Sequence, residues 1–415
     1  MDIPEEIIIE ILKYFSVREL LELELVNKQF LKIIRSNKWP NLKVGFMNLT
    51  ILKNHSFINY YLTYSTITDQ ILQFFRNCKS LELNNTKITD KGLQYLSNSN
   101  NLVTCKSLDL SGCRITDKGL QFLINCEKLN LSGCNITNKG LQYLSNSKNL
   151  ITCKELNLTW CDITNQGLQY LRNCEILNLS RCNITDQGLQ FLTNCKKINL
   201  TCCNITDEGL QFLQNCKDIN LSHCKITDNG LQFLTKCHNI ILRSCNITDK
   251  GLKYLSNSKN MITCKKLILH SCKITDKGLR YLSNSGNLIN CENIDLSYCN
   301  ITDEGLQYLA NYKIIGLSRC NVTDEGLRYL SNSENLINCK YIDLYNCEIT
   351  NREYTYLEKY YKMHIYPINI IDENLPYDDQ CIGLKDYCHR ITDKGLKYLK
   401  NCEKLYLSDS VISKK

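Results

Sequence analysis

Residues 126–144 read CEKLNLSGCNITNKGLQYL, and close copies of this stretch recur along most of the chain. Each copy contains a phrase of the form I-T-D-x-G-L-x-(Y/F)-L, whose first residue, Ile136 in this copy, we call the anchor of the repeat. The anchors are Ile67, Ile88, Ile115, Ile136, Ile163, Ile184, Ile205, Ile226, Ile247, Ile274, Ile301, Val322 and Ile349, with two later copies at Ile370 and Ile391. Of the fourteen intervals between anchors, nine are 21 residues and five are 27. Such spacing is typical of one continuous repeat array.

Each copy predicts a strand, a turn and a short helix. Leu129 and Leu131 alternate with polar residues, as in a strand, whereas the apolar residues of 140–144 have the three-residue spacing of a helix. Thr137 is placed to cap that helix, and the Asp or Asn after it puts acidic or polar character at the positive end of the helix dipole. Gly140 is expected to let the helix approach its neighbour closely.

A unit of 21 or 27 residues cannot bury its own apolar face and must stack on copies of itself. The predicted fold is therefore an α/β solenoid, a horseshoe with a parallel sheet on its concave face and helices on its convex face. The long copies carry an insertion such as 145–152, which we place between the helix and the next strand, with Leu150 and Ile151 turned inward. Proline is absent from residues 41 to 366, as an unbroken array requires.

Composition excludes several classes of protein. With 43% hydrophobic residues, the chain of 415 residues can bury a large core, unlike a disordered chain. A net charge of +8 is too small to indicate a strongly basic nucleic-acid binder. No apolar run reaches 18 residues, and the N-terminus is acidic where a secretory signal would be basic. We therefore expect a cytoplasmic or nuclear protein that contacts neither nucleic acid nor membrane.

The 26 cysteines follow the repeat. Thirteen lie ten residues before an anchor or at the equivalent position, eleven lie two residues before one, and only Cys202 and Cys388 fall outside both rows. This spacing lacks the C-x-x-C pairs of metal sites, so we expect buried small hydrophobes rather than a metal site or disulfides. The sequence also lacks H-E-x-x-H, G-x-S-x-G and a phosphate-binding glycine loop. We therefore expect that the chain is not an enzyme and that it holds no metal and no cofactor.

The repeats resemble the cysteine-containing leucine-rich repeat of F-box and related proteins, whose unit reads L-x-x-L-x-L-x-x-C-x-x-I-T-D-x-G-L-x-x-L. The resemblance covers residues 58 to 412, and this chain departs from it by shortening nine intervals to 21 residues. It implies the same horseshoe fold.

Residues 1–40 depart from the repeat. Apolar positions three and four residues apart predict helices over 4–14, 17–24 and 26–36. The segment resembles an F-box, with Ile3, Phe15 and Glu19 in place of the usual Leu, Leu and Asp. We therefore divide the chain into an F-box-like segment (1–40), an N-terminal cap or linker (41–60) and a solenoid of about 15 repeats (61–415).

The resemblance to F-box proteins implies a partner and a function. In that family the F-box docks on a Skp-type adaptor and through it on a cullin scaffold, so the chain would be the substrate-recognition subunit of an SCF-type ubiquitin ligase. The implied adaptor-facing residues are Pro4, Ile7, Ile8, Leu12, Leu20, Leu21 and Val26. The alternative is that these residues only cap the first repeat, because a solenoid must cover its open core.

A substrate surface is predicted on the concave face, where residues beside the inward leucines turn outward. The candidates are Trp160, Arg181, His223, Ile241, Arg243, Ile268, His270, Tyr298, Arg319 and Tyr345. Aromatics and Arg are typical of interface hot spots, and two exposed aliphatics, Ile241 and Ile268, strengthen the prediction. The three arginines favour an acidic or phosphorylated ligand, although Asp295 and Asp343 oppose it. The row of asparagines on the same strands is the alternative: a solvated ladder without a ligand.

Two other functions fit the same pattern. The chain could be a binding scaffold or inhibitor that masks a partner without recruiting a ligase, or a decoy whose F-box occupies the adaptor without ubiquitin transfer. In each case we expect a monomer within a larger complex.

Overall fold

The computed structural model describes residues 8, 9, 12, 32–34, 38–43, 56–63, 67–75, 78–98, 105–123, 126–146, 153–257, 263–283, 290–309, 312–323, 325, 326, 339, 341–345 and 347. The chain divides into residues 1–367 and 368–415, and every described residue lies in the first unit. The repeats anchored at Ile370 and Ile391 therefore lie outside the described residues.

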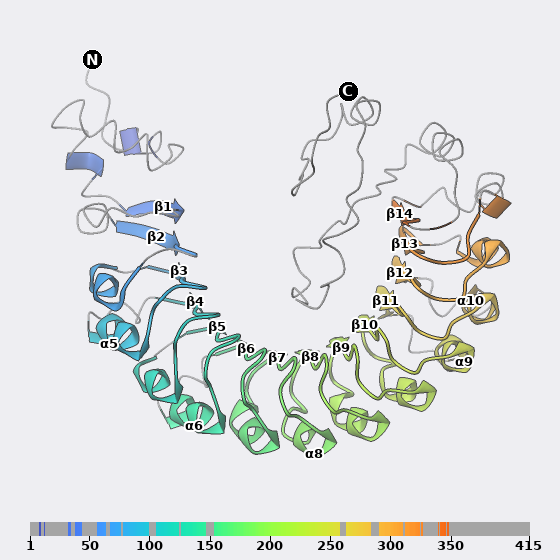
Figure 1. Ribbon diagram of the computed structural model, residues 1–415, viewed down its shortest axis with the longest axis horizontal. Coiled ribbons are helices and arrows are strands. Elements are labelled where there is room, and N and C mark those ends of the chain that lie inside the picture. The colour runs from blue at the N-terminus through green and yellow to red at the C-terminus, as the bar shows by residue number, and fades with distance from the viewer. Residues whose placement is uncertain are drawn as a thin grey trace, which may run out of the picture. The chain divides into compact units, whose positions relative to one another are not determined.

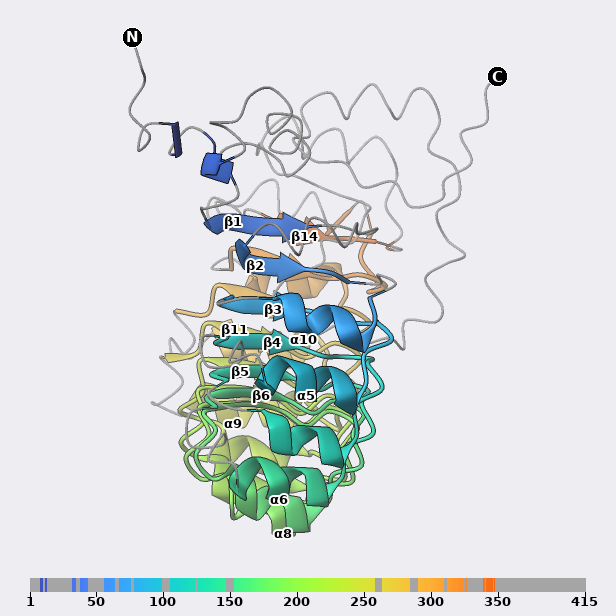
Figure 2. The same cartoon turned by 90° about the vertical axis from the view of Figure 1, so that its left-hand side faces the viewer.

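One parallel sheet of 14 strands, in sequential order, forms the spine of the first unit. The strands are β1 (Lys38–Lys43), β2 (Ser56–Tyr61), β3 (Ser80–Glu82), β4 (Ser107–Asp109), β5 (Lys128–Asn130), β6 (Glu155–Asn157), β7 (Ile176–Asn178), β8 (Lys197–Asn199), β9 (Asp218–Asn220), β10 (Asn239–Ile241), β11 (Lys266–Ile268), β12 (Asn293–Asp295), β13 (Ile314–Gly316) and β14 (Tyr341–Asp343). Figure 1 shows the sheet along the inside of a curved solenoid and the helices along its outside, which confirms the predicted fold class. Figure 2 shows the strands stacked one above another.

The pairing register of neighbouring strands is the same from repeat to repeat, so that equivalent leucines lie opposite one another. Leu129 lies opposite Leu108 on one side and Leu156 on the other. In the described repeats the anchor residues and the apolar residues five and seven positions before them are buried, and so are most of the cysteines. The core thus runs the length of the array, as expected of units that cannot bury an apolar face alone.

Repeat length decides the type of helix. The 27-residue repeats carry α5 (Asp90–Asn98), α6 (Asn138–Asn146), α9 (Asp249–Asn257) and α10 (Asp276–Ser283). The 21-residue repeats carry the four-residue α8 (Asp186–Leu189) or the 3₁₀ helices η1 (Asp69–Phe74), η3 (Asp117–Phe122), η4 (Asn165–Leu171), η5 (Asp207–Leu213), η6 (Asp228–Phe233) and η8 (Asp303–Tyr308). A 3₁₀ helix rises about 2.0 Å per residue against about 1.5 Å for an α-helix, so six residues span nearly the height of nine.

The insertion of the long repeats therefore begins inside the helix. Ser145 and Asn146 belong to α6, whereas the sequence placed the whole of 145–152 after the helix. The prediction was wrong on this point because extra residues allow a full α-helix to form, and an α-helix is the better hydrogen-bonded of the two. Leu150 and Ile151 lie outside the described residues.

A carboxylate or amide bridges each junction between the described repeats anchored from Ile67 to Val322. Asp117 accepts hydrogen bonds from the Thr137 N–H (2.8 Å) and from the Thr137 hydroxyl (2.7 Å) of the following repeat. Thr137 Oγ1 also accepts from the Lys139 N–H (3.2 Å), which confirms its predicted capping role. The same bridge recurs in Asp69–Thr89, Asp90–Thr116, Asp186–Thr206, Asp207–Thr227, Asp228–Thr248, Asp249–Thr275, Asp276–Thr302 and Asp303–Thr323. In Asn138–Thr164 and Asn165–Thr185 the amide oxygen accepts from the Thr N–H and the amide nitrogen donates to the Thr hydroxyl.

The glycine four residues after the anchor makes room for this bridge. A Cβ on Gly278 would lie 2.5 Å from Asp249 Oδ1 and 2.9 Å from Leu252 Cδ1, both in the preceding repeat. Because such separations are far inside van der Waals contact, the predicted close approach of neighbouring helices is confirmed.

Two strands precede the first anchor pattern and were not predicted. β1 begins at Lys38, inside the F-box-like segment, and pairs in parallel with β2, which in turn pairs with β3. The sheet therefore extends through the region that the sequence assigned to a cap or linker. Residues 8, 9, 12 and 32–34 are helical, in agreement with the first and third predicted helices, while 17–24 lies outside the described residues.

Candidate functional site

The concave face is built from positions counted back from each anchor. The residue six before the anchor ends the strand, and those four and three before it form the turn that follows. We call these positions −6, −4 and −3. In the repeat anchored at Ile163 they are Asn157, Thr159 and Trp160.

Most polar residues at position −6 serve the backbone of their own turn. Asn157 Oδ1 accepts from the Thr159 N–H (3.0 Å) and from the Thr159 hydroxyl (2.7 Å). The N–H at −4 is capped in the same way in Asp109–Ser111, Asn130–Ser132, Asn178–Ser180, Asn199–Thr201, Asn220–Ser222, Asp295–Ser297 and Asp343–Tyr345. The asparagine row is therefore part of the turn, a role that neither the ligand nor the solvated-ladder interpretation foresaw.

Two adjacent repeats lack this cap. Ile241 and Ile268 replace the Asn at −6, and Arg243 and His270 stand at −4. Ile241 lies opposite Ile268 in the register of β10 and β11. Among the described residues, neither the Arg243 N–H nor the His270 N–H has a hydrogen-bond acceptor. The Ser318 N–H, which follows Gly316 at −6, also has none there.

Position −3 is left-handed in eleven described turns, from Asn85 to Arg319. Trp160, Arg181, His223, Tyr298 and Arg319 have φ between 57° and 63°. Bulky residues seldom adopt this conformation, and each such residue costs of order 1–3 kcal/mol. Gly112 and Gly133 occupy the same position with φ of 66° and 69°, so these two glycines were the sequence signal for the turn.

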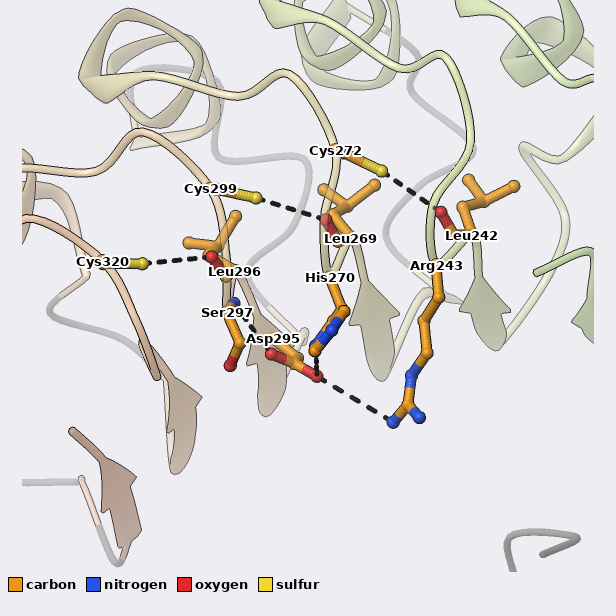
Figure 3. A network of polar contacts seen from close by, with 10 residues as sticks. All are labelled: Leu242, Arg243, Leu269, His270, Cys272, Asp295, Leu296, Ser297, Cys299 and Cys320. Atoms are coloured by element: carbon orange, nitrogen blue, oxygen red, sulfur yellow. Dashed lines mark hydrogen bonds and ion pairs between the residues drawn. The ribbon is translucent and has the colours of Figure 1, made fainter. Parts of the chain in front are cut away.

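Asp295, at the end of β12, is the centre of a polar cluster with residues from the turns that follow β10 and β11 (Figure 3). Its Oδ2 lies 4.0 Å from Arg243 Nη2 and 4.0 Å from His270 Nδ1. The His270 ring also packs against Tyr298, with centroids 4.7 Å apart. The sequence named three of these residues and treated Asp295 only as an opposing charge, because nothing in a linear spacing shows that one carboxylate serves two neighbouring repeats.

The histidine of this cluster is held neutral. Burial lowers the pKa of His270 below its ordinary value, Asp295 acts in the opposite direction, and Arg243 lowers the pKa further. The cluster thus carries one cation, Arg243, facing one anion, Asp295, across a gap too long for a direct hydrogen bond.

Two aromatic–arginine pairs stand at position −3. Arg181 stacks over Trp160 at 4.3 Å, and Arg319 stacks over Tyr298 at 5.1 Å, measured to the ring centroids. Trp160 is 55% exposed and Tyr298 46% exposed. Exposed aromatic surface next to a cation is what a protein partner contacts most strongly at interfaces.

The structure brings together only part of the predicted substrate surface. Arg243 and His270 converge on Asp295, Tyr298 packs against His270, and Arg319 stacks over Tyr298. Trp160 and Arg181 form a separate pair. His223 stands at position −3 of the repeat anchored at Ile226, and the Tyr345 N–H is capped by Asp343.

The expectation of two exposed aliphatics was wrong. Ile268 is only 3% exposed, and Ile241 is half-buried. An Ile at −6 is therefore largely withdrawn from solvent rather than projecting from the concave face.

Of the predicted adaptor-facing residues, two are described. Ile8 is half-buried and Leu12 is 2% exposed. Pro4, Ile7, Leu20, Leu21 and Val26 lie outside the described residues.

The cysteines two before the anchors are buried hydrogen-bond donors. The thiol of Cys182 donates to the Leu158 carbonyl oxygen at 3.2 Å, and the equivalent bond recurs from Cys113 to Cys347. Burial raises the pKa of Cys182 to about 12, with a smaller contribution from Cys161. No cysteine in the described part of the chain forms a disulfide, and all of them but Cys202 and Cys347 are buried.

Alkylation by iodoacetamide at pH 8 should label Cys202 long before Cys182. A pKa of about 12 leaves about a thousandfold less thiolate than the ordinary value, and the thiolate is the reacting species. Mass spectrometry of the peptides after a time course measures the two rates. Labelling in urea is the control, in which both thiols should react alike. Equal labelling rates of Cys202 and Cys182 in the folded protein would contradict the burial of the cysteines two residues before the anchors.

Within the described residues, no group of three or more His, Cys, Asp or Glu side chains is arranged to hold a metal ion. In the same part of the chain, no helix has both the length and the apolar character needed to cross a membrane.

Comparison with protein families decides the class of this chain. The F-box domain matches residues 1–41. The leucine-rich repeat matches residues 79–97, 106–123, 127–145, 153–171, 175–192, 194–213, 217–234, 240–256 and 292–310. The chain belongs to the F-box proteins with leucine-rich repeats. This architecture is typical of non-catalytic adaptor proteins.

One solved structure shares the repeat fold of this F-box/leucine-rich-repeat protein, and a second is reported for comparison. An internalin (inlF) from Listeria monocytogenes has a TM-score of 0.52 and 20% identity, over 78% of this chain and 90% of that chain. A leucine-rich-repeat protein from Leptospira interrogans has a TM-score of 0.48 and 15% identity, over 81% of this chain and 97% of that chain. No curated protein matches the sequence.

Proposed function

We propose that this protein is the substrate-recognition subunit of an SCF-type ubiquitin ligase, acting in the cytoplasm or nucleus. The observation that carries the proposal is the succession of an F-box at residues 1–41 and a leucine-rich-repeat array. The F-box would dock on a Skp-type adaptor and through it on a cullin scaffold, while the concave face holds a protein substrate. The chain itself is a monomer in that complex and performs no chemistry.

Such a subunit accelerates ubiquitin transfer by proximity. Holding a substrate beside a charged conjugating enzyme replaces a bimolecular encounter with an effectively intramolecular one. The stacked repeats suit this task because their regular sheet presents side chains at fixed spacing. The exposed rings of Trp160 and Tyr298 and the cluster around Asp295 supply the contact groups.

The proposed adaptor-facing set is Pro4, Ile7, Ile8, Leu12, Leu20, Leu21 and Val26. Leu12 is 2% exposed, which favours a packing role for this side chain and puts more weight on the other six. A purely capping segment would need no partner at all, so binding of the adaptor separates the two interpretations.

Co-expression with a Skp-type adaptor should yield a complex that the double variant Leu20→Lys/Leu21→Lys does not form. Placing two charges in an apolar contact leaves them unpaired and desolvated, which costs several kcal/mol per ion. The readout is the adaptor retained after affinity purification and gel filtration. Tyr254→Ala, at an exposed position on the convex face, is the control and should retain the adaptor.

The same preparation distinguishes the alternatives. A wild-type chain that fails to retain the adaptor would reject both the ligase and the decoy, leaving a scaffold or inhibitor. If the adaptor binds, reconstituted transfer of ubiquitin to a captured partner supports the ligase, whereas binding without transfer identifies a decoy.

A further inference from the structure

The turns at Arg243 and His270 leave hydrogen-bond donors without acceptors. In eight other described repeats an Asn or Asp oxygen from position −6 caps the N–H at −4, for example Asn220 on Ser222 at 3.0 Å. Ile241 and Ile268 have no such oxygen. A donor that stays unsatisfied at a partly buried site destabilises the fold, so an acceptor arriving from outside is favoured there.

Arg243 adds a third donor of the same kind. Its Nε is buried and, among the described residues, has no hydrogen-bond partner. The guanidinium reaches Asp295 only at 4.0 Å, and Asp295 Oδ1 is already occupied by the Ser297 N–H at 3.0 Å. The site therefore has more donors than acceptors, which indicates a ligand that brings oxygen atoms.

Register places the two uncapped turns side by side. Ile241 pairs with Ile268 on neighbouring strands, and the Ser244 N–H donates to the His270 carbonyl oxygen at 2.8 Å. Adjacent parallel strands are about 4.8 Å apart, so the two N–H groups stand within reach of one small oxygen-bearing group. The His270 side chain lies between those of Arg243 and Asp295 (Figure 3).

The charges of Arg243 and Asp295 determine which oxygen-bearing group fits the site. A carboxylate matches the planar fork of Arg243 and is the group that caps the equivalent N–H in the Asp109, Asp295 and Asp343 repeats. Asp295 offsets the charge of Arg243, and this favours a single negative charge over the doubly charged phosphate of a phosphorylated residue.

We propose that the uncapped turns at Arg243 and His270 bind an Asp or Glu side chain from an acidic segment of the protein partner. The partner's carboxylate takes the place that an Asn oxygen fills in the other repeats and accepts from both backbone N–H groups and from the Arg243 guanidinium. This inference rests on the proposed function only in naming the partner as a substrate, because the binding step itself needs no adaptor.

The test is to restore the missing cap. Ile241→Asn should place an amide oxygen on the Arg243 N–H. A bulky residue at −4 does not prevent such a cap, because Asp343 Oδ1 accepts from the N–H of Tyr345, which is as bulky as Arg243. A fluorescein-labelled peptide of four glutamates is titrated into the full chain and followed by anisotropy. We expect binding to the wild type, and binding about tenfold or more weaker to Ile241→Asn and to Arg243→Gln.

Ile176→Asn is the matched control. It makes the same chemical change on the concave face, at the start of β7, where no −4 turn is missing its cap. Its affinity for the peptide should stay within twofold of the wild type. Circular dichroism of all variants checks that the fold persists, and Ile241, being only half-buried, is the safer of the two isoleucines to replace.

A second measurement reports on the site directly. Selective 15N-histidine labelling gives a spectrum with six histidines, in which His270→Gln assigns the His270 amide. The glutamate peptide should shift this amide in the wild type, and the shift should disappear in Ile268→Asn. An unshifted amide during saturable binding would place the peptide elsewhere and overturn the proposal.

Titrations with two other peptides distinguish the possible ligands. A four-glutamine peptide should not bind, and a diphosphoserine peptide should bind no more tightly than the glutamate peptide. Binding of the phosphopeptide alone, equal affinity of Ile241→Asn and wild type, or absence of binding by any peptide would each overturn the proposal. Since no adaptor is present, a failed adaptor complex would reject the ligase function without touching this result.

Discussion

Gly278→Ala should destabilise the array by about 2–3 kcal/mol, although helix propensity alone predicts a gain of about 1 kcal/mol. The new Cβ would lie 2.5 Å from Asp249 Oδ1 and 2.9 Å from Leu252 Cδ1. Asp249 cannot move away freely, because it accepts from the Thr275 N–H (2.9 Å) and hydroxyl (2.7 Å). The substitution therefore either compresses the junction or breaks both hydrogen bonds.

Urea denaturation followed by circular dichroism measures this loss. The control is Lys277→Ala, which changes a neighbouring exposed residue of α10 to alanine and should leave the midpoint nearly unchanged. Hydrogen exchange should localise the weakened region to the junction between α9 and α10. A higher midpoint for Gly278→Ala would show that helix propensity outweighs the contact, and the close-approach explanation of the glycine would fail.

Asp228→Ala should cost about 2–4 kcal/mol, whereas Asp228→Asn should stay within about 1 kcal/mol of the wild type. Asp228 accepts from the Thr248 N–H (2.8 Å) and hydroxyl (2.6 Å), and alanine leaves both donors unsatisfied. Asparagine retains the oxygen for the N–H, and the Thr248 hydroxyl can turn to accept from the new amide.

The chain already contains the asparagine form of this bridge. Asn165 Oδ1 accepts from the Thr185 N–H at 2.9 Å, while its Nδ2 donates to the Thr185 hydroxyl at 2.6 Å. The reciprocal change Asn165→Asp is therefore the control and should be tolerated equally. The midpoints of urea unfolding compare all three variants. An asparagine variant as unstable as the alanine one would show that charge, rather than hydrogen bonding, holds the junction.

Repeat patterns made the fold predictable to a fine level. The alternation of Leu129 and Leu131 placed a strand where β5 is found, and the burial of the cysteine rows followed from their fixed spacing. These features depend on which residues can be hidden from water, and that property is written in the identity and period of the side chains.

The same pattern could not distinguish a 3₁₀ helix from an α-helix. The helical residues of η3 and of the start of α6 read DKGLQF and NKGLQY, so their composition is nearly the same. What differs is the chain available between the helix and the next strand, and stacking fixes the distance that this chain must span. Only the packed array imposes that constraint.

The candidate site shows most clearly what the sequence could not predict. Arg243, His270 and Tyr298 were identified by residue type, but the approach of Arg243 and His270 to Asp295 and the packing of Tyr298 on His270 span three repeats and depend on register and side-chain direction. The role of Asn220 and its equivalents in capping turns was also missed, because a hydrogen bond over two residues requires the turn geometry to be known.

Sequence by itself determined that the chain is an F-box followed by stacked leucine-rich repeats, since each repeat must bury its apolar face against a copy. Tertiary structure alone decided where donors lack acceptors. The Ile at −6 is one more aliphatic in the sequence, and its consequence for the Arg243 and His270 N–H groups appears only when the turn is folded and the expected oxygen is missing from it.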